Sequence, residues 1–305
     1  MIRLGPAGWS YKDWKGIVYP ASKPKGFQEL TYISEFFDTV EINVTFYRPI
    51  PARTAESWVK KPEKKKRFKF TGKLWQGFTH DRDAGAEDER LFKDGYAPLL
   101  QAGRLGAILI QFPWSFRNTD ENRHYVARLQ QRFEKYPLVL EVRHSSWNEI
   151  GMLEWLAELD IGLCNIDQPL FHKSIKPGAE VTSSVGYVRL HGRNYKNWFA
   201  ENTQPHERYD YLYTVDELEP WVDRVRSVGA KSKDTYAVTN NHYVGKATVN
   251  ALEMASLLKR EPVKAPPSLV EHYPELREFV KKSGRGSQAA SLIQRYTTAL
   301  LRVLE

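Results

Sequence analysis

The sequence contains very little cysteine and no long apolar run. Cys164 is the only cysteine among 305 residues, so the chain can form neither a disulfide with itself nor a zinc site built from several thiolates. No apolar stretch approaches the roughly 20 residues that a membrane-spanning helix needs, and the chain begins with a strand pattern rather than an apolar signal region. We therefore expect a cytoplasmic protein without a membrane partner, with Cys164 packed in its core.

The common nucleotide-binding loops are also missing. No Gly-x-Gly-x-x-Gly follows the first predicted strand and no Walker loop occurs, so a nucleotide-binding open sheet lacks support. Charge, by contrast, is plentiful, and 45 Lys and Arg against 37 Asp and Glu give a net charge of +8. This excess allows an anionic small molecule or a nucleic acid as partner. Part of the excess lies in a lysine-rich stretch at residues 60–73, most simply interpreted as a solvated loop that leads into a strand.

Short apolar segments alternate with amphipathic ones along most of the chain. Strands are predicted from their apolar and β-branched residues at 2–8, 39–46, 67–71, 105–112, within 136–147, and at 162–167, 186–191 and 235–240. Helices are predicted between them at 26–36, 52–60, 86–102, 119–133, 147–159, 215–228 and 245–258. Strands that are apolar on both faces indicate a parallel sheet covered by helices. Eight such units predict an α/β fold, a (β/α)8 TIM barrel, with a doubly wound open sheet as the alternative.

A proline-rich break at residues 262–267 ends this repeat. We therefore predict a barrel domain over residues 1–261 and a C-terminal helical extension over residues 262–305. Helices are expected in the extension at 268–282 and 287–304, and the second carries an apolar stripe that includes Leu292, Tyr296 and Leu300. The stripe is expected to pack on the outside of the barrel, which favours a monomer, and a dimer contact is the alternative.

Polar residues follow the predicted strands where the strands end. Within residues 136–147, buried Leu and Val give way to Glu141, Arg143 and His144, and alternation places Glu141 and Arg143 on the same face. The loops after barrel strands converge on one face, where the site of such a fold lies. The other strand ends supply Glu41, Asn43, Lys69, Lys73, His80, Gln111, Asp167, Arg189, His191, Asn240, Asn241 and His242. The alternative interpretation is a structural ion-pair network that closes the barrel mouth.

These residue types suit three kinds of chemistry. Carboxylates and imidazoles from separate strands can bind a divalent metal, although no single motif has metal-ligand spacing. Paired carboxylates can cleave a glycosidic bond. Lysine and arginine side chains can hold phosphate or carboxylate groups. Loop aromatics such as Trp9, Tyr11 and Tyr47 can line a pocket for a sugar or a base, and their alternative role is to close the end of the barrel.

Taken together, several of these segments resemble one family, the DUF72 (YecE-like) proteins. The resemblance runs over roughly residues 3 to 260 and is carried by Gly8-Trp-Ser-Tyr, Glu41-Ile-Asn-Val-Thr-Phe-Tyr-Arg48, Gln111-Phe-Pro, Glu141-Val-Arg-His-Ser-Ser-Trp147, Val188-Arg-Leu-His-Gly192 and Asn240-Asn. It implies a TIM barrel related in shape to sugar isomerases and apurinic endonucleases, and it implies no established reaction. The chain departs from the family at Val44, where serine is commoner, and in the tail after Pro262.

Our main hypothesis from the sequence is a metal-assisted hydrolase or phosphodiesterase that acts on a phosphorylated or nucleic-acid substrate. Its catalytic groups would be Glu41, Glu141, His144, Asp167 and His191, of which Glu141, Asp167 and His191 would bind a divalent Mn, Zn or Mg ion. The predicted substrate-binding residues are Trp9, Tyr11, Asn43, Tyr47, Lys69, Lys73, Gln111, Arg143, Arg189, Asn240 and Asn241. Two alternatives stand beside it, a nucleic-acid-binding protein without catalysis and a sugar isomerase or glycosidase.

Overall fold

A computed structural model describes residues 1–200 and 205–282 of the chain. Eight strands form a single sheet in the order β1-β8-β7-β6-β5-β4-β3-β2, and every neighbouring pair is parallel. The strands are β1 (Ile2–Pro6), β2 (Thr39–Ile42), β3 (Lys69–Lys73), β4 (Leu105–Gln111), β5 (Leu138–Glu141), β6 (Gly162–Asp167), β7 (Val185–Leu190) and β8 (Asp234–Thr239). This arrangement confirms the predicted (β/α)8 TIM barrel.

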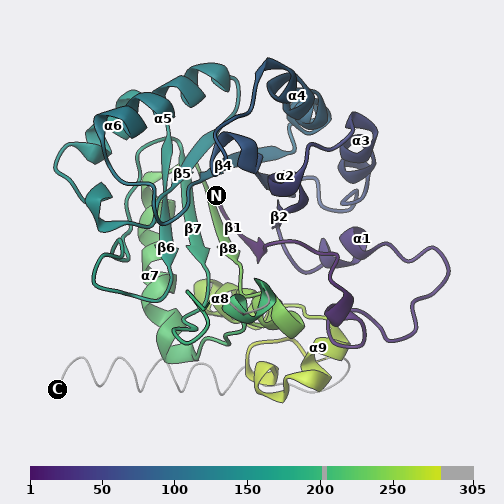
Figure 1. Ribbon diagram of the computed structural model, residues 1–305. Coiled ribbons are helices and arrows are strands. Elements are labelled where there is room, and N and C mark those ends of the chain that lie inside the picture. The colour runs from purple at the N-terminus through teal and green to yellow at the C-terminus, as the bar shows by residue number, and fades with distance from the viewer. Residues whose placement is uncertain (201–204, 283–305) are drawn as a thin grey trace, which may run out of the picture.

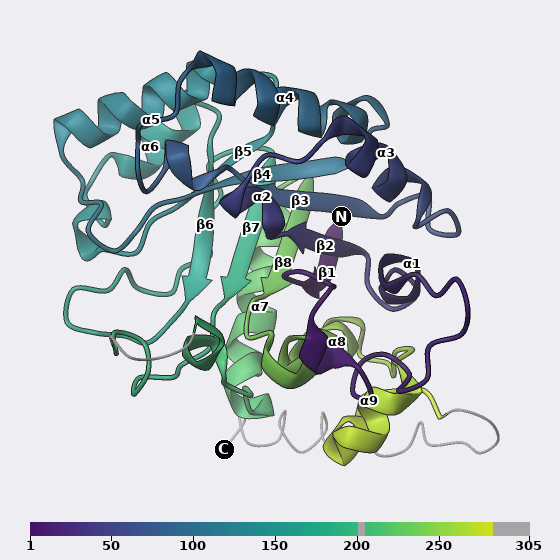
Figure 2. The same ribbon diagram turned by 45° about the vertical axis from the view of Figure 1, so that its right-hand side comes forward.

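Helices lie around the outside of the sheet, as Figures 1 and 2 show. They are α1 (Glu29–Ile33), α2 (Val44–Tyr47), α3 (Ala52–Lys60), α4 (Ala86–Gln101), α5 (Asp120–Arg132), α6 (Met152–Glu158), α7 (Val215–Lys231), α8 (Lys246–Lys259) and α9 (Pro267–His272). Strands β2, β5, β6 and β7 consist wholly of buried residues, because side chains cover both faces of the sheet. In the described part of the chain, no helix has the length and apolar character that crossing a membrane requires.

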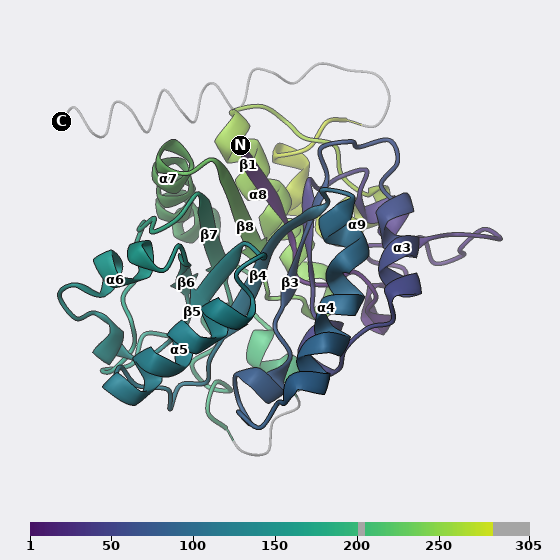
Figure 3. The same ribbon diagram turned by 90° about the horizontal axis from the view of Figure 1, so that it is seen from above.

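The barrel closes between its first and second strands. Gly8 N donates a hydrogen bond to Glu41 O at 2.8 Å, just beyond the end of β1. Within the strand, a Cβ atom added to Gly5 would lie 1.8 Å from Thr39 O, at the start of β2. A glycine is therefore required for β1 to approach β2 this closely. The view in Figure 3 shows the strands inside and the helices outside.

Local side-chain contacts explain why one predicted strand boundary was wrong. The strand predicted at 39–46 ends at Ile42, and Val44–Tyr47 forms the short helix α2. Thr45 Oγ1 donates to Ile42 O at 3.1 Å and accepts from Tyr96 Oη of α4 at 2.9 Å. The hydroxyl group thus holds the chain in a turn, which overrides the β propensity of Val44 and Thr45.

Two predicted helices are shorter than expected for backbone reasons. The helix predicted at 147–159 begins only at Met152, because Gly151 has a φ of 83° and interrupts the chain before it. The helix predicted at 268–282 is divided into α9 and a 3-10 turn over Pro274–Glu278. Pro274 has no N–H group to continue the hydrogen bonds of α9.

The described part of the extension, residues 262–282, packs against the barrel. Val263 N donates to Phe279 O at 2.9 Å, which joins the two ends of the segment. Leu269 and Leu276 are completely buried. Tyr273 Oη donates to Val244 O at 2.7 Å in the loop after β8, where Val244 has a φ of 45°. The helix predicted at 287–304 lies outside the described residues, and the boundary between residues 261 and 262 stays a prediction.

Shortening one buried side chain of the extension tests this packing. We expect Leu276→Ala to lower the free energy of unfolding by about 2–5 kcal/mol, because the change removes buried methyl groups and leaves a cavity. The exposed neighbour Arg277 supplies the control, since Arg277→Ala should change stability by no more than about 0.5 kcal/mol. Urea titration followed by circular dichroism measures both. Equal, small effects would mean that the extension is not part of the cooperative fold.

Candidate functional site

Arg189 lies at the centre of a buried charge cluster at the carboxyl ends of the strands. From β7 it binds Glu41 of β2 in a bidentate manner, with Nε 3.0 Å from Oε2 and Nη2 2.7 Å from Oε1. Its Nη1 donates to Glu141 Oε2 of β5 at 2.8 Å and to Gln111 Oε1 of β4 at 3.0 Å. Arg189 is 1% exposed and both carboxylates are 0% exposed. Four strands therefore meet through one guanidinium group.

Glu141 has two further cationic or polar neighbours. As alternation along the strand predicts, Arg143 lies on the same side, with Nε and Nη2 at 3.2 and 3.0 Å from Glu141 Oε1. His191 Nε2 is 3.1 Å from the same oxygen. Burial alone would raise the pKa of Glu141, but Arg189, His191 and Arg143 hold it well below its usual range. Glu141 is therefore a carboxylate whose two oxygens both accept hydrogen bonds.

His191 is held as a neutral imidazole in one tautomer. Its Nδ1 lies 3.1 Å from Asn240 Nδ2, an amide nitrogen that can only donate. Nδ1 is therefore the unprotonated nitrogen, and Nε2–H donates to Glu141. Burial lowers the pKa of His191 to about 3, although Glu141 acts in the opposite direction. The ring thus serves as a fixed donor toward Glu141 near neutral pH.

Lys73, the last residue of β3, lies beside this cluster. It is 8% exposed, and its Nζ lies 4.0 Å from the centre of the Phe46 ring. Burial and the nearby Arg189 lower the pKa of Lys73 to about 7, against the opposing effect of Glu41 and Glu141. The neutral amine and the ammonium form are therefore both present near pH 7.

His80, from the turn after β3, packs against the same aromatic ring as Lys73. The His80 and Phe46 rings are edge to face at 4.9 Å, and Thr79 Oγ1 lies 3.0 Å from His80 Nδ1. Burial, together with the charges of Lys73 and Arg143, lowers the pKa of His80 to about 4. The Lys73 amine, whose pKa is about 7, and the neutral His80 imidazole therefore both contact the Phe46 ring.

Aromatic side chains border the cluster. Trp198 lies under the Arg143 guanidinium, 5.5 Å from its ring centre, and contacts the His191 ring edge to face at 6.1 Å. The Tyr11 ring stacks on His242 at 4.4 Å. The Tyr11 hydroxyl donates to the carbonyl of Ala7 and accepts from Asn43 Nδ2 at 3.2 Å. Tyr11 and Asn43 thus lie near Glu41.

Two predicted catalytic residues do not join this cluster. Asp167 is fully buried, but Arg193 holds both its oxygens at 2.9 and 3.1 Å, and Tyr213 donates a short hydrogen bond to it. His144 follows Arg143 and faces another direction. Its Nδ1 accepts from Ser146 N at 3.1 Å, and its ring packs against Trp114. The structure therefore places Asp167 and His144 in contacts that support loops.

Some predicted substrate-binding residues also lie elsewhere. The prediction for Lys69 is corrected, because Lys69 is the first residue of β3 and lies at the opposite end of the strand from Lys73, where its Nζ donates to Gly103 O. Trp9 packs edge to face against Trp58 of α3. Tyr47 of α2 is 66% exposed but stays near the mouth, close to Tyr11 and Tyr209.

Asn241 is also separate from Arg189 and its partners, even though it follows Asn240 directly. Its Nδ2 donates to Tyr211 O and to Asn250 Oδ1, both at 2.8 Å. Asn241 therefore positions the loop before α7 and the helix α8. Of the two asparagines, only Asn240 contacts His191.

The predicted metal ligands do not fit a divalent ion. Glu141 and Asp167 each have both oxygens engaged by arginine, and a cation placed beside them would be repelled by Arg189 or Arg193. His191 accepts at Nδ1 and donates at Nε2, so neither nitrogen offers a lone pair. Among residues 1–200 and 205–282, no group of three or more His, Cys, Asp or Glu side chains is arranged to hold a metal. We therefore derive no chemical step from a metal.

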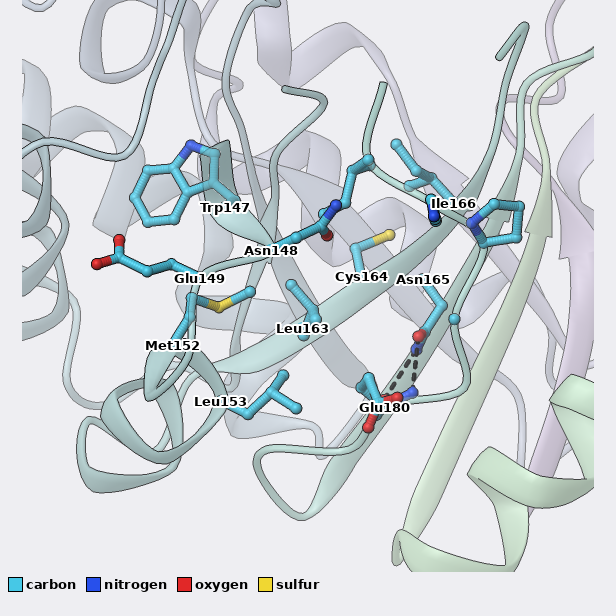
Figure 4. A pocket seen from close by; sticks show the side chains of 14 residues that line it. Trp147, Asn148, Glu149, Met152, Leu153, Leu163, Cys164, Asn165, Ile166 and Glu180 are labelled. Carbon is cyan, nitrogen blue, oxygen red and sulfur yellow. Dashed lines mark hydrogen bonds between the residues drawn. The ribbon is translucent and has the colours of Figure 1, made fainter. Parts of the chain in front are cut away.

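One member of the cluster and one pocket were not predicted from the sequence. Tyr187 Oη lies 2.9 Å from Glu41 Oε2 and 2.8 Å from Thr71 Oγ1. It precedes Arg189 by two residues, so alternation along β7 could have identified it. The pocket, of about 410 Å³, lies beside β6 and α6. Figure 4 shows its lining residues, where Asn165 exchanges hydrogen bonds with the backbone of Glu180. None of the predicted site residues lines this pocket.

Comparisons with known proteins agree with the fold and specify no reaction. The family model described as a protein of unknown function, DUF72, matches residues 3–273. UPF0759 protein YunF of Bacillus subtilis (strain 168) is 30% identical over 282 residues, which are 86% of this chain and 96% of that protein. A DUF72 family crystal structure from Thermotoga maritima is 30% identical, with a TM-score of 0.74 over 85% of this chain and 99% of that one. One from Enterococcus faecalis is 27% identical, with a TM-score of 0.74 over 85% and 96%.

Removing the charge of Glu141 tests how far the fold depends on the cluster. We expect Glu141→Gln to lower the free energy of unfolding by about 3–5 kcal/mol, because two arginines lose a buried counter-charge. The control is Glu149→Gln, whose exposed ion pair with Arg123 should contribute about 0–1 kcal/mol. Both follow from urea unfolding at neutral pH. A loss no larger than that of the control would show that the cluster does not stabilise the fold.

The neutral state of His191 predicts a pH dependence of stability. Its pKa of about 3 in the folded chain lies below the ordinary value of about 6.5, so between these values the unfolded chain binds a proton that the folded chain does not. Stability is therefore lost as the pH falls from about 6.5 toward about 3. His191→Gln should reduce the slope of unfolding free energy against pH near pH 5 by about 1.4 kcal/mol per pH unit. Leu276→Ala, which destabilises without touching a titrating group, should keep the slope. An unchanged slope in His191→Gln would contradict a neutral buried imidazole.

Proposed function

Because the chain belongs to the DUF72 family of proteins of unknown function, we propose its function from the chemistry of its own side chains: it is an enzyme that acts by proton transfer on a small anionic substrate at the carboxyl end of the barrel. The observation that carries this proposal is the buried amine of Lys73, which lies beside two arginines and on the face of Phe46 and whose pKa is lowered to about 7. An amine whose pKa is close to the pH of the medium is suited to accept and return protons.

Arg143 is the group best suited to bind the anion. Its side chain is 12% exposed, whereas that of Arg189 is 1% exposed. Its Nε and Nη2 are anchored on Glu141, and in the described part of the chain its Nη1 makes no hydrogen bond. A phosphate or carboxylate can take a charge-assisted hydrogen bond from Nη1. Trp198, under the guanidinium plane, keeps Arg143 in this orientation.

The anionic substrate expected from the sequence is kept. The metal-assisted phosphodiesterase and the glycosidase are not. A metal-assisted phosphodiesterase would need ligands that Glu141, Asp167 and His191 do not offer together. A glycosidase would need one carboxyl group that can donate a proton. Glu141 is a poor candidate, because its pKa lies well below its usual range. Glu41 has both its oxygens bound by Arg189.

The lysine-rich stretch does not support nucleic-acid binding at this site. It leads into the amino-terminal end of β3, opposite Lys73. There Lys65 Nζ binds Phe37 O at 2.9 Å and Asp38 at 3.1 Å. The basic stretch and the cluster around Arg189 therefore belong to different ends of the barrel, and a single strand of nucleic acid bound at one would not be held by the other.

Turnover of a mixture of small anions tests the proposal. The protein is incubated with pooled phosphorylated and carboxylated metabolites, with and without EDTA, and losses are followed by mass spectrometry. We expect one compound to be consumed by the wild type and its consumption to fall by about 100-fold or more in Lys73→Met, the scale of a lost acid–base group. Lys12→Met, at an exposed position, is the control. Consumption that stops with EDTA would contradict a metal-free reaction, and binding without consumption would contradict an enzyme.

A further inference from the structure

Lys73 differs from the other basic groups of the cluster because its nitrogen has no carboxylate partner. Arg189 binds Glu41 and Glu141, and Arg143 binds Glu141. Within residues 1–200 and 205–282, Lys73 Nζ makes no hydrogen bond or ion pair, and it contacts the face of Phe46. A lysine that serves only to balance charge in a buried cluster would be expected to pair with one of the two carboxylates. The nitrogen is instead left available to a ligand.

We propose, resting on the function proposed above, that the substrate is a small carbonyl compound with a carboxylate or phosphate group, and that Lys73 Nζ forms an imine with its carbonyl carbon. Arg143 would hold the anionic group, and the carbonyl would lie between Arg143 and Lys73. Both side chains keep some exposure, at 12% for the Arg143 side chain and 8% for Lys73, and the charge of Arg143 acts on the Lys73 amine.

The step requires no oxidant, reductant or metal. The amine lone pair attacks the carbonyl carbon, a C–N bond forms, and the π electrons move to oxygen, which receives the proton that nitrogen releases. The C–O bond of this carbinolamine then breaks, one solvent proton is taken up, and water leaves. The product is a protonated imine, which can accept electrons from a neighbouring C–H or C–C bond. Lysines activated by desolvation and a neighbouring cation are the groups that form such imines in other enzymes.

The charges around Lys73 favour the neutral, nucleophilic amine. Arg189 from β7 and Arg143, two residues after the end of β5, disfavour the ammonium form, and the opposing carboxylates Glu41 and Glu141 are both occupied by arginine. His80, in the turn after β3, is the remaining titrating neighbour, and its lowered pKa keeps it uncharged near pH 7. Burial and the two arginines therefore outweigh the two carboxylates and the face of the Phe46 ring, which favour the ammonium form.

Reductive trapping tests this proposal without knowledge of the substrate. The full-length protein is mixed with sodium cyanoborohydride and one of three probes, pyruvate, dihydroxyacetone phosphate or formaldehyde, and labelled peptides are quantified by mass spectrometry. We expect pyruvate or dihydroxyacetone phosphate to label Lys73 about 10-fold faster or more than the exposed Lys12 near pH 7, because far more of the Lys73 amine is neutral there. Labelling at Lys73 should decline as the pH is lowered from about 8 to about 6.

Two variants separate the nucleophile from the anion site. Lys73→Met keeps much of the side-chain length without adding a permanent buried charge, and it should abolish rapid labelling by every probe. Arg143→Gln should slow labelling of Lys73 by the two anionic probes about 10-fold more than labelling by neutral formaldehyde, because only the anionic probes use the guanidinium, whereas the loss of its charge beside Lys73 acts on all three probes alike. Melting curves establish that both variants are folded before they are compared.

The outcomes distinguish this inference from the proposed function. Labelling of Lys73 by formaldehyde but by neither anionic probe would overturn the imine with an anionic carbonyl compound, while metal-free turnover that depends on Lys73 could still hold. Labelling of Lys73 no faster than of Lys12 with all three probes would likewise overturn it. Fast labelling by an anionic probe that Arg143→Gln does not slow would overturn the role of Arg143.

Discussion

The structure depends above all on one arginine that is shared by two buried carboxylates. Glu41 and Glu141 come from strands on different sides of the barrel, and each would be costly to bury as an ion by itself. Arg189 reaches both, and this contact ties β2, β5 and β7 together at their carboxyl ends. Because the two carboxylates are already paired in this way, a further positive charge in the cluster would gain little stabilisation.

This balance explains the unusual protonation states nearby. Two carboxylates and two arginines already cancel, so a protonated His191 or Lys73 would add uncompensated charge in a buried place. His191 responds by staying neutral and donating from one nitrogen, as Asn240 dictates. Lys73 responds with a pKa near neutrality. A divalent cation would disturb the same balance, which is why ligand types that looked suitable in the sequence do not make a metal site in the folded chain.

Local sequence rules predicted the barrel and part of the candidate site. The repeat of apolar strands and amphipathic helices was sufficient for the fold, and alternation correctly paired Glu141 with Arg143. Lys69 and Lys73 show what such rules cannot decide. Both lie on one face of β3, but Lys69 begins the strand and Lys73 ends it, so only Lys73 reaches the cluster. Asp167 was assigned to the same site because it ends β6, but Arg193 and Tyr213 of a later loop bind it, and no local pattern encodes that contact.

The loop after β8 is fixed by residues from both ends of the described chain. Val244 is β-branched and has a φ of 45°, a conformation that such a residue adopts only under constraint. Its N–H donates to Asp13 at 2.7 Å, and its carbonyl accepts from Tyr273 in the extension. Asn240, which sets the tautomer of His191, lies four residues before it. The segment after α9 thus supports, from the outer surface, the loop that follows Asn240 at the mouth of the barrel.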